Sequence, residues 1–164
     1  MQKDQIKKTL IEYFQKKDLA YKSNEGENII RSSFKIGNKL GVIDLETIIR
    51  DNMYVVIAEF PLHVYKEKTS SISEYVLRAN WGMIKGCFDF EVDDGKIIFR
   101  YTNDLHDTTI TDDEIEDSLY LPLSMMQQYG DGFLEVIVNN KSPKEVINAI
   151  ENSSEETNPQ TVHA

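Results

Sequence analysis

The spacing of apolar and polar residues divides the chain into helical and strand-like stretches. Near the start, four apolar residues follow the i, i+4, i+7, i+8 spacing of a helix with one buried face: Ile6, Leu10, Tyr13 and Phe14. We therefore predict a helix over residues 5–18. Three stretches rich in Ile, Val, Phe and Tyr follow at 28–36, 40–50 and 53–60. Such residues favour strands, and the intervening Gly-Asn and Asp-Asn pairs suit tight turns, so these stretches predict an antiparallel meander.

Two capping-box patterns mark helix starts in the rest of the chain. In a capping box, a Ser or Thr and the Glu three residues later each bond to a backbone N–H at the other's position. Ser71 begins one such pattern and predicts a helix to about Ile84. Thr111 begins the other and predicts a long C-terminal helical region. We expect Pro122 to kink and break that region, because proline has no backbone N–H to donate.

A second hairpin and a last helix complete the predicted fold. Residues 86–92 and 96–101 predict strands on either side of an Asp-Asp-Gly turn, and Pro143 is preorganised for the first position of a short helix. The predicted order is helix, three strands, helix, two strands and a long helical region, which is an α+β domain with an antiparallel sheet. We predict one domain over residues 1–151 and a disordered acidic and polar tail over residues 152–164.

Composition and charge exclude several classes of protein. No stretch approaches the roughly 20 apolar residues of a membrane span, and the N-terminus lacks the apolar segment of a secretory signal, so we expect a cytoplasmic protein. The net charge of −10 argues against nucleic acid as the main partner, because Lys and Arg supply most of the affinity for phosphates. The lone Cys87 cannot form a disulfide within the chain, and we interpret it as a small buried apolar residue.

The chain carries no motif of metal, nucleotide or nucleophilic chemistry. Its three histidines are scattered without metal-binding spacing. Residues 89–95 are similar to a calcium loop, but the glycine comes one position late and Arg100 stands where the bidentate Glu belongs. The nucleophile-elbow, P-loop, dinucleotide-binding and HExxH motifs are all absent. We therefore expect no cofactor, no metal and no enzymatic activity.

Two alternatives stay open at this point. One is an enzyme that uses Asp104 and Asp107 with His106, because these residues fall in one predicted loop and functional residues often lie in loops. A concave site around His106 would favour this alternative, and a flat exposed loop would exclude it. The other alternative is a small-molecule sensor with a pocket between the sheet and the long helix.

The central and C-terminal half contains two distinctive stretches, VLRANWGMIKGCFDFEVDDGKIIFRYTNDL and SLYLPLSMMQQYGDGFLEVIVNNKSPKEVINAIE. Their recognisable parts are a helix with Arg78 and Asn80, the hairpin GCFDFEVDDGKIIFR, and a helix with Met126, Tyr129 and Gly132 before a KSP-type helix start. From Val76 to Glu151 the chain resembles the YbjN-like family, whose members are described as "putative bacterial sensory transduction regulators". Pro122 and the residues before Ser71 depart from the pattern of the family.

The resemblance implies a fold similar to that of type III secretion chaperones. It also implies a small non-catalytic bacterial module, dimeric, with a regulatory or chaperone-like role and no catalytic residues to carry over. Our first hypothesis is a protein-binding module that holds an extended or helical segment of a partner at a sheet edge or a helix–sheet groove. The candidate binding residues, each with a packing or capping alternative, are Arg78, Asn80, Trp81, Arg100 and Tyr129. For Trp81 we expect core packing, although it lies off the buried stripe of its helix.

Overall fold

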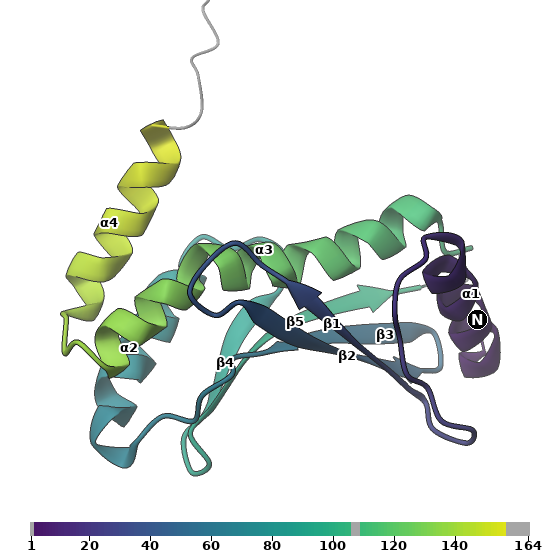
Figure 1. Cartoon of the computed structure of the whole chain (residues 1–164), viewed down its shortest axis with the longest axis horizontal. Helices are drawn as coiled ribbons and strands as arrows, with labels where there is room; N and C mark the ends of the chain where they lie inside the picture. Colours follow the sequence, from purple (N-terminus) through teal and green to yellow (C-terminus); the bar gives the residue numbers. More distant parts are fainter. Residues whose placement is uncertain (1, 106–108, 157–164) are drawn as a thin grey trace, which may run out of the picture.

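The computed structural model describes residues 2–105 and 109–156 and is built from one sheet and four α-helices (Figure 1). The elements in chain order are α1 (Lys3–Lys16), β1 (Ile29–Lys35), β2 (Val42–Arg50), β3 (Met53–Glu59), the 3-10 helix η1 (Lys66–Lys68), α2 (Thr69–Asn80), β4 (Cys87–Glu91), β5 (Lys96–Asp104), α3 (Asp112–Ile137) and α4 (Pro143–Glu156). The five strands pair antiparallel in the order β1-β2-β3-β5-β4. The predicted α+β class and element order are confirmed.

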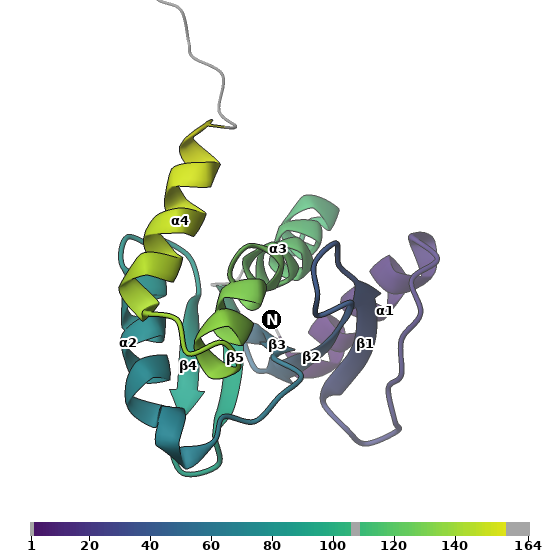
Figure 2. The same cartoon turned by 60° about the vertical axis from the view of Figure 1, so that its left-hand side comes forward.

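One face of the sheet, the inner face, carries most of the core because side chains alternate between the two faces of a strand. The buried inner-face residues are Ile30, Ile43, Leu45, Ile49, Tyr54, Val56, Ala58, Phe88, Ile97 and Phe99. Helix α3 packs on β3 and β5, α1 packs on β2 and β3, and α2 lies against β4. Figure 2 shows α4 continuing from α3 beside α2 and rising away from the sheet.

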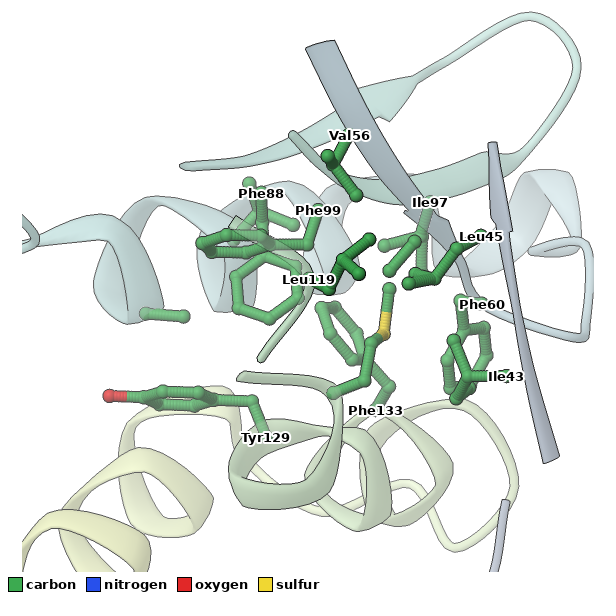
Figure 3. Close-up of a cluster of buried hydrophobic side chains, with 14 of the residues drawn as sticks. Ile43, Leu45, Val56, Phe60, Phe88, Ile97, Phe99, Leu119, Tyr129 and Phe133 are labelled. Atoms are coloured by element: carbon green, nitrogen blue, oxygen red, sulfur yellow. The ribbon is translucent and has the colours of Figure 1, made fainter. Parts of the chain in front are cut away.

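A cluster of aromatic rings joins the sheet to α2 and α3 (Figure 3). Phe133 of α3 is fully buried, and its ring centroid lies 4.5 Å from Tyr75 of α2 and 5.3 Å from Phe88 of β4. Phe88 also meets Phe99 at 5.0 Å and Tyr129 at 5.7 Å, both edge to face. Such contacts add to the free energy that burial of the rings supplies. The position of α2 beside the sheet therefore depends on a few residues of this cluster.

The two predicted capping boxes have different outcomes. At α3 the box is present: Thr111 is the N-cap, the Glu114 N–H donates to its hydroxyl, and the Thr111 N–H donates to the Glu114 carboxylate. The prediction of a capping box at Ser71 is wrong. The 3-10 turn η1 leads directly into α2 at Thr69, so Ser71 lies inside the helix, and Glu74 instead pairs with Arg78 at 2.7 Å.

Two predicted helix ends also differ from the structure. Helix α2 ends at Asn80 instead of about Ile84, because Trp81 is extended and Gly82 has φ +87°, which glycine adopts readily. Helix α3 is not broken at Pro122 and runs on to Ile137. Pro122 is buried on the apolar face of α3, and tertiary packing of such a face stabilises a helix more than the lost hydrogen bond costs.

The predicted division into a domain and a tail stays a prediction. Helix α4 reaches Glu156, beyond the predicted start of the tail at residue 152, and residues 157–164 lie outside the described residues. Within residues 2–105 and 109–156, none of the helices combines the length and the apolar character needed to cross a membrane.

Candidate functional site

The face of the sheet opposite the helices, the outer face, holds a groove of about 850 Å³. The outer-face groove is lined by residues of all five strands and of the segment before β1: Ala20, Tyr21, Lys22, Arg31, Ser32, Ser33, Asp44, Leu45, Glu46, Ile57, Glu59, Asp89, Phe90, Glu91, Lys96 and Ile98. The register places the side chains of Ser32, Leu45 and Phe90 on the inner face, so these three residues border the groove with their backbone. None of the lining residues belongs to a helix. The groove therefore lies on the part of the sheet that the described helices leave open.

The register of the sheet brings residues from distant parts of the sequence together in the groove. Arg31 of β1, Glu46 of β2 and Ile57 of β3 lie directly opposite one another and form one row across the strands. Asp44, Glu59 and Ile98 form the next row. Side chains of directly opposite residues lie within contact distance on one face of a sheet. Half-buried Ile57 and Ile98 thus form an apolar floor between charged residues of β1, β2 and β4.

Ion pairs order the charged side chains around this floor. The Arg31 guanidinium lies 3.0 Å from the Glu46 carboxylate and 2.8 Å from that of Glu27, and these bonds raise the pKa of Arg31 above its ordinary value. Lys96 lies 2.7 Å from Glu59. The lining contains five carboxylates (Asp44, Glu46, Glu59, Asp89 and Glu91) and three cations (Lys22, Arg31 and Lys96), so its net charge is 3 − 5 = −2.

One wall of the groove is an extended segment that adds to the edge of β1. Lys22 and Arg31 form an antiparallel bridge, in which each backbone N–H donates to the other residue's carbonyl at 2.8 Å. The neighbouring Tyr21 packs its ring 5.6 Å from that of Phe14 in α1. This edge therefore already pairs with the chain itself at one isolated bridge.

The opposite edge of the sheet, β4, is closed at one point by Asn80. The Asn80 amide Nδ2 donates to the carbonyl oxygen of Phe88, and the Phe88 N–H donates to Asn80 Oδ1, both at 2.8 Å. The side chain thus occupies the two backbone groups that an added strand would use at Phe88. We conclude that Asn80 fixes the end of α2 to the sheet edge.

We predict that Asn80→Ala lowers the free energy of unfolding by about 1–3 kcal/mol, because the backbone N–H and C=O of Phe88 both lose a partly buried hydrogen bond. The matched control is Arg78→Ala on the same helix, which removes only the exposed pair with Glu74 and should cost less than about 0.5 kcal/mol. Urea unfolding measures both values. Equal costs for the two variants would contradict the role given to Asn80.

The five predicted binding residues do not gather in one site. Arg78 lies on α2 in its pair with Glu74, and Tyr129 is buried against Phe88. Arg100 lies on the outer face, 2.7 Å from Asp89, which lines the groove. Trp81 is 88% exposed, so its expected core packing is wrong; the early end of α2 turns it toward solvent.

Sequence reasoning missed the residues that form the groove. Outer-face positions of β2 and β3 alternate with the core residues, and several of them are apolar, such as Ile48, Val55 and Ile57. Such apolar residues at positions that alternate with the core were the signal in the sequence for a binding surface on the outer face. The alternation alone does not say which of these residues lie side by side, because that depends on strand register.

The described residues offer little for catalytic chemistry. Cys87 is half-buried on the outer face, where burial and the neighbouring Asp89 carboxylate raise the pKa of its thiol, so the reactive thiolate is disfavoured. Within residues 2–105 and 109–156, no group of three or more His, Cys, Asp or Glu side chains is placed to hold a metal ion. Asp104 ends β5, whereas His106 and Asp107 of the alternative enzyme hypothesis lie outside the described residues.

Comparison with known proteins gives a family and a similar fold. The model of the YbjN family, described as "Putative bacterial sensory transduction regulator", matches residues 8–135. The crystal structure of YbjN from E. coli, described as "a putative transcription regulator", is similar with a TM-score of 0.56 and 12% sequence identity. The alignment covers 76% of this chain and 91% of that one, and at this identity it shows the fold alone. No curated protein matches the chain.

Proposed function

Since the chain belongs to the YbjN family, we propose that it is a non-catalytic regulatory module that binds a segment of a partner protein in the outer-face groove. The description of the family supports the regulatory role. The binding of a protein segment, a chaperone-like action on that segment and a cytoplasmic location in a bacterium are our own extension of it.

The observation that carries the proposal is the composition of the outer-face groove. An antiparallel sheet commonly exposes one polar face to water, so an open face alone means little. Here the open face is hollowed, and Ile57 and Ile98 lie at its floor, with one ion pair on β1 and β2 and another farther along β3 and β5. An apolar floor with a few fixed polar groups is the usual composition of a binding site.

The edge at β1 supports binding of an extended segment at this face. Residues of the chain itself already add to β1 through the Lys22–Arg31 bridge and form a wall of the groove. Addition of an extended segment to a sheet is a recurrent mode of peptide recognition, in which backbone bonds give affinity and side-chain pockets give specificity.

We predict that Ile57→Lys abolishes the capture of partner protein from a bacterial lysate by the tagged chain, because it places a charge on the floor of the groove. The matched control is Tyr120→Lys on α3, whose side chain is 69% exposed and outside the groove. Capture is quantified after crosslinking, and circular dichroism confirms that both variants are folded. If the tagged chain enriches only untagged copies of itself, the groove is occupied by a second copy in the predicted homodimer.

Equal capture by wild type and both variants would contradict the proposal. The small-molecule sensor is the second candidate, with its site moved from the predicted place between the sheet and the long helix to the outer face. The groove volume of about 850 Å³ falls within the range of small-ligand sites, roughly 300–1,000 Å³. For that candidate, a ligand should raise the Tm of the wild type and of Tyr120→Lys while leaving the Tm of Ile57→Lys unchanged.

A further inference from the structure

We infer that the partner segment held in the outer-face groove is cationic, carrying Lys or Arg side chains around at least one apolar side chain. The inference rests on the proposed function and specifies the chemistry of its partner. It is argued from the charges of the groove, from the way each charge is engaged, and from the apolar floor.

Two of the three cations of the lining, Arg31 and Lys96, are paired with carboxylates within the structure, and Lys22 is the third. Arg31 is shared by two carboxylates, Glu27 and Glu46, and Lys96 lies beside Glu59. On the β4 side, Arg100 is held by Asp89 at 2.7 Å. An anionic segment would therefore meet Lys22 and two cations whose charge is already balanced, and it would also meet a lining with a net charge of −2.

Among residues 2–105 and 109–156, two carboxylates of the lining face no cation at salt-bridge distance. Asp44 accepts a hydrogen bond from the Ser33 hydroxyl at 2.6 Å, and the Glu91 carboxylate accepts from the backbone N–H groups of Asp93 and Asp94. These neutral donors fix the carboxylates in place and leave their negative charge uncompensated. Asp44 comes from β2 and Glu91 from β4, so the two charges stand on either side of β3 and β5.

The floor between these charges strengthens their effect. Ile57 and Ile98 exclude water from beneath a bound segment, and an ionic attraction is stronger where water is displaced. An apolar side chain of the segment would cover the two isoleucines while long Lys or Arg side chains reach the carboxylates at the sides. Complementary charge of this kind mainly sets specificity and the rate of association.

The test uses two labelled model peptides of equal length, one alternating Lys with Ile and the other Glu with Ile, measured by fluorescence anisotropy on the intact chain. We expect the Lys peptide to bind at least about tenfold tighter than the Glu peptide. Its affinity should fall as NaCl is raised from about 0.05 to about 0.5 M, because salt screens the attraction. Equal or tighter binding of the Glu peptide would overturn the inference.

A pair of variants separates the groove from the overall charge of −10. Asp44→Lys lies in the groove and Asp117→Lys lies at an exposed position of α3, and both raise the net charge by two units. We expect Asp44→Lys to weaken the Lys peptide about tenfold and Asp117→Lys to weaken it less than about threefold. Equal weakening by both would mean attraction to the whole acidic surface and would overturn the inference.

The two proposals fail in different ways. If Ile57→Lys abolishes partner capture but the chain binds the Lys and Glu peptides equally, the groove binds a partner and the inference that this partner is cationic is wrong. If the Lys peptide binds in the groove and no partner capture depends on Ile57, the charge complementarity is correct and the proposed function is wrong.

Discussion

Phe133→Ala will lower the free energy of unfolding by about 3–5 kcal/mol, the usual cost of removing a large buried aromatic ring. Phe133 is fully buried, and its ring meets Phe60 at 5.3 Å, Tyr75 at 4.5 Å and Phe88 at 5.3 Å. Phe60 directly follows β3, Tyr75 belongs to α2 and Phe88 belongs to β4, so the substitution removes a ring that connects all three to α3. Urea unfolding followed by far-UV circular dichroism gives the cost.

The control for this prediction is Phe133→Leu, which keeps an apolar side chain and most of the volume. It should cost less than about 1.5 kcal/mol. A small domain has only about 5–15 kcal/mol of stability, so the leucine variant stays measurable even if the alanine variant unfolds. Equal small costs for both variants would contradict the central position of Phe133 in the aromatic cluster.

Gly95→Ala will have the second largest effect, about 2–5 kcal/mol. Gly95 has φ +74°, where an L-residue costs about 1–2 kcal/mol, and its added Cβ would lie 2.4 Å from the carbonyl oxygen of Val64. That oxygen belongs to the backbone and cannot rotate away, so the overpacking adds about 1–3 kcal/mol. The Gly95 carbonyl also accepts the Val64 N–H at 2.8 Å, which ties the β4–β5 hairpin to the residues after β3.

Gly82→Ala isolates the backbone part of this cost. Gly82 has φ +87°, and nothing lies within 4 Å of its added Cβ, so only the strain of about 1–2 kcal/mol applies. Thermal unfolding of the two variants in parallel measures the difference. A Gly95→Ala cost no larger than that of Gly82→Ala would show that the hairpin moves away from Val64 freely. Such movement would also displace Glu91 and Lys96 in the groove.

Much of the fold was predictable because the periodicity of the sequence is strong in its strands. In β2 the buried residues Ile43, Leu45, Thr47 and Ile49 alternate strictly with accessible ones, and α1 buries the four residues that its spacing predicts. The periodicity of buried residues predicts the type of such an element even where its exact ends are not predicted. The element ends were harder, since they depend on local conformation.

The two capping boxes show why the ends were harder to predict. Ser71 and Thr111 carry the same sequence signal, but only Thr111 has the extended backbone of an N-cap, with φ −91° and ψ 158°. Ser71 lies two residues inside α2, because the preceding 3-10 turn starts the helix earlier. Nothing in the local sequence pattern distinguishes the two cases.

The candidate site was out of reach of the sequence for a different reason. The groove combines residues from Ala20 to Ile98, and the register of four strand pairs decides that Ile57 lies beside Glu46 and not beside another residue of β2. Charge and motif searches favoured Arg78, Trp81 and Tyr129, which the structure places on a helix surface, at a helix end and in the core. Only Arg100 lies next to the groove, through its pair with Asp89.

The most direct test of the groove as the partner-binding site is photo-crosslinking inside bacterial cells. A photoreactive phenylalanine analogue replaces either Ser33, which is exposed in the groove, or Tyr120, which is exposed on α3. We predict that illumination produces a covalent adduct with a partner protein at Ser33 and none of the same mass at Tyr120. An adduct at Tyr120 with none at Ser33 would place the partner on the helical side and contradict the proposed function.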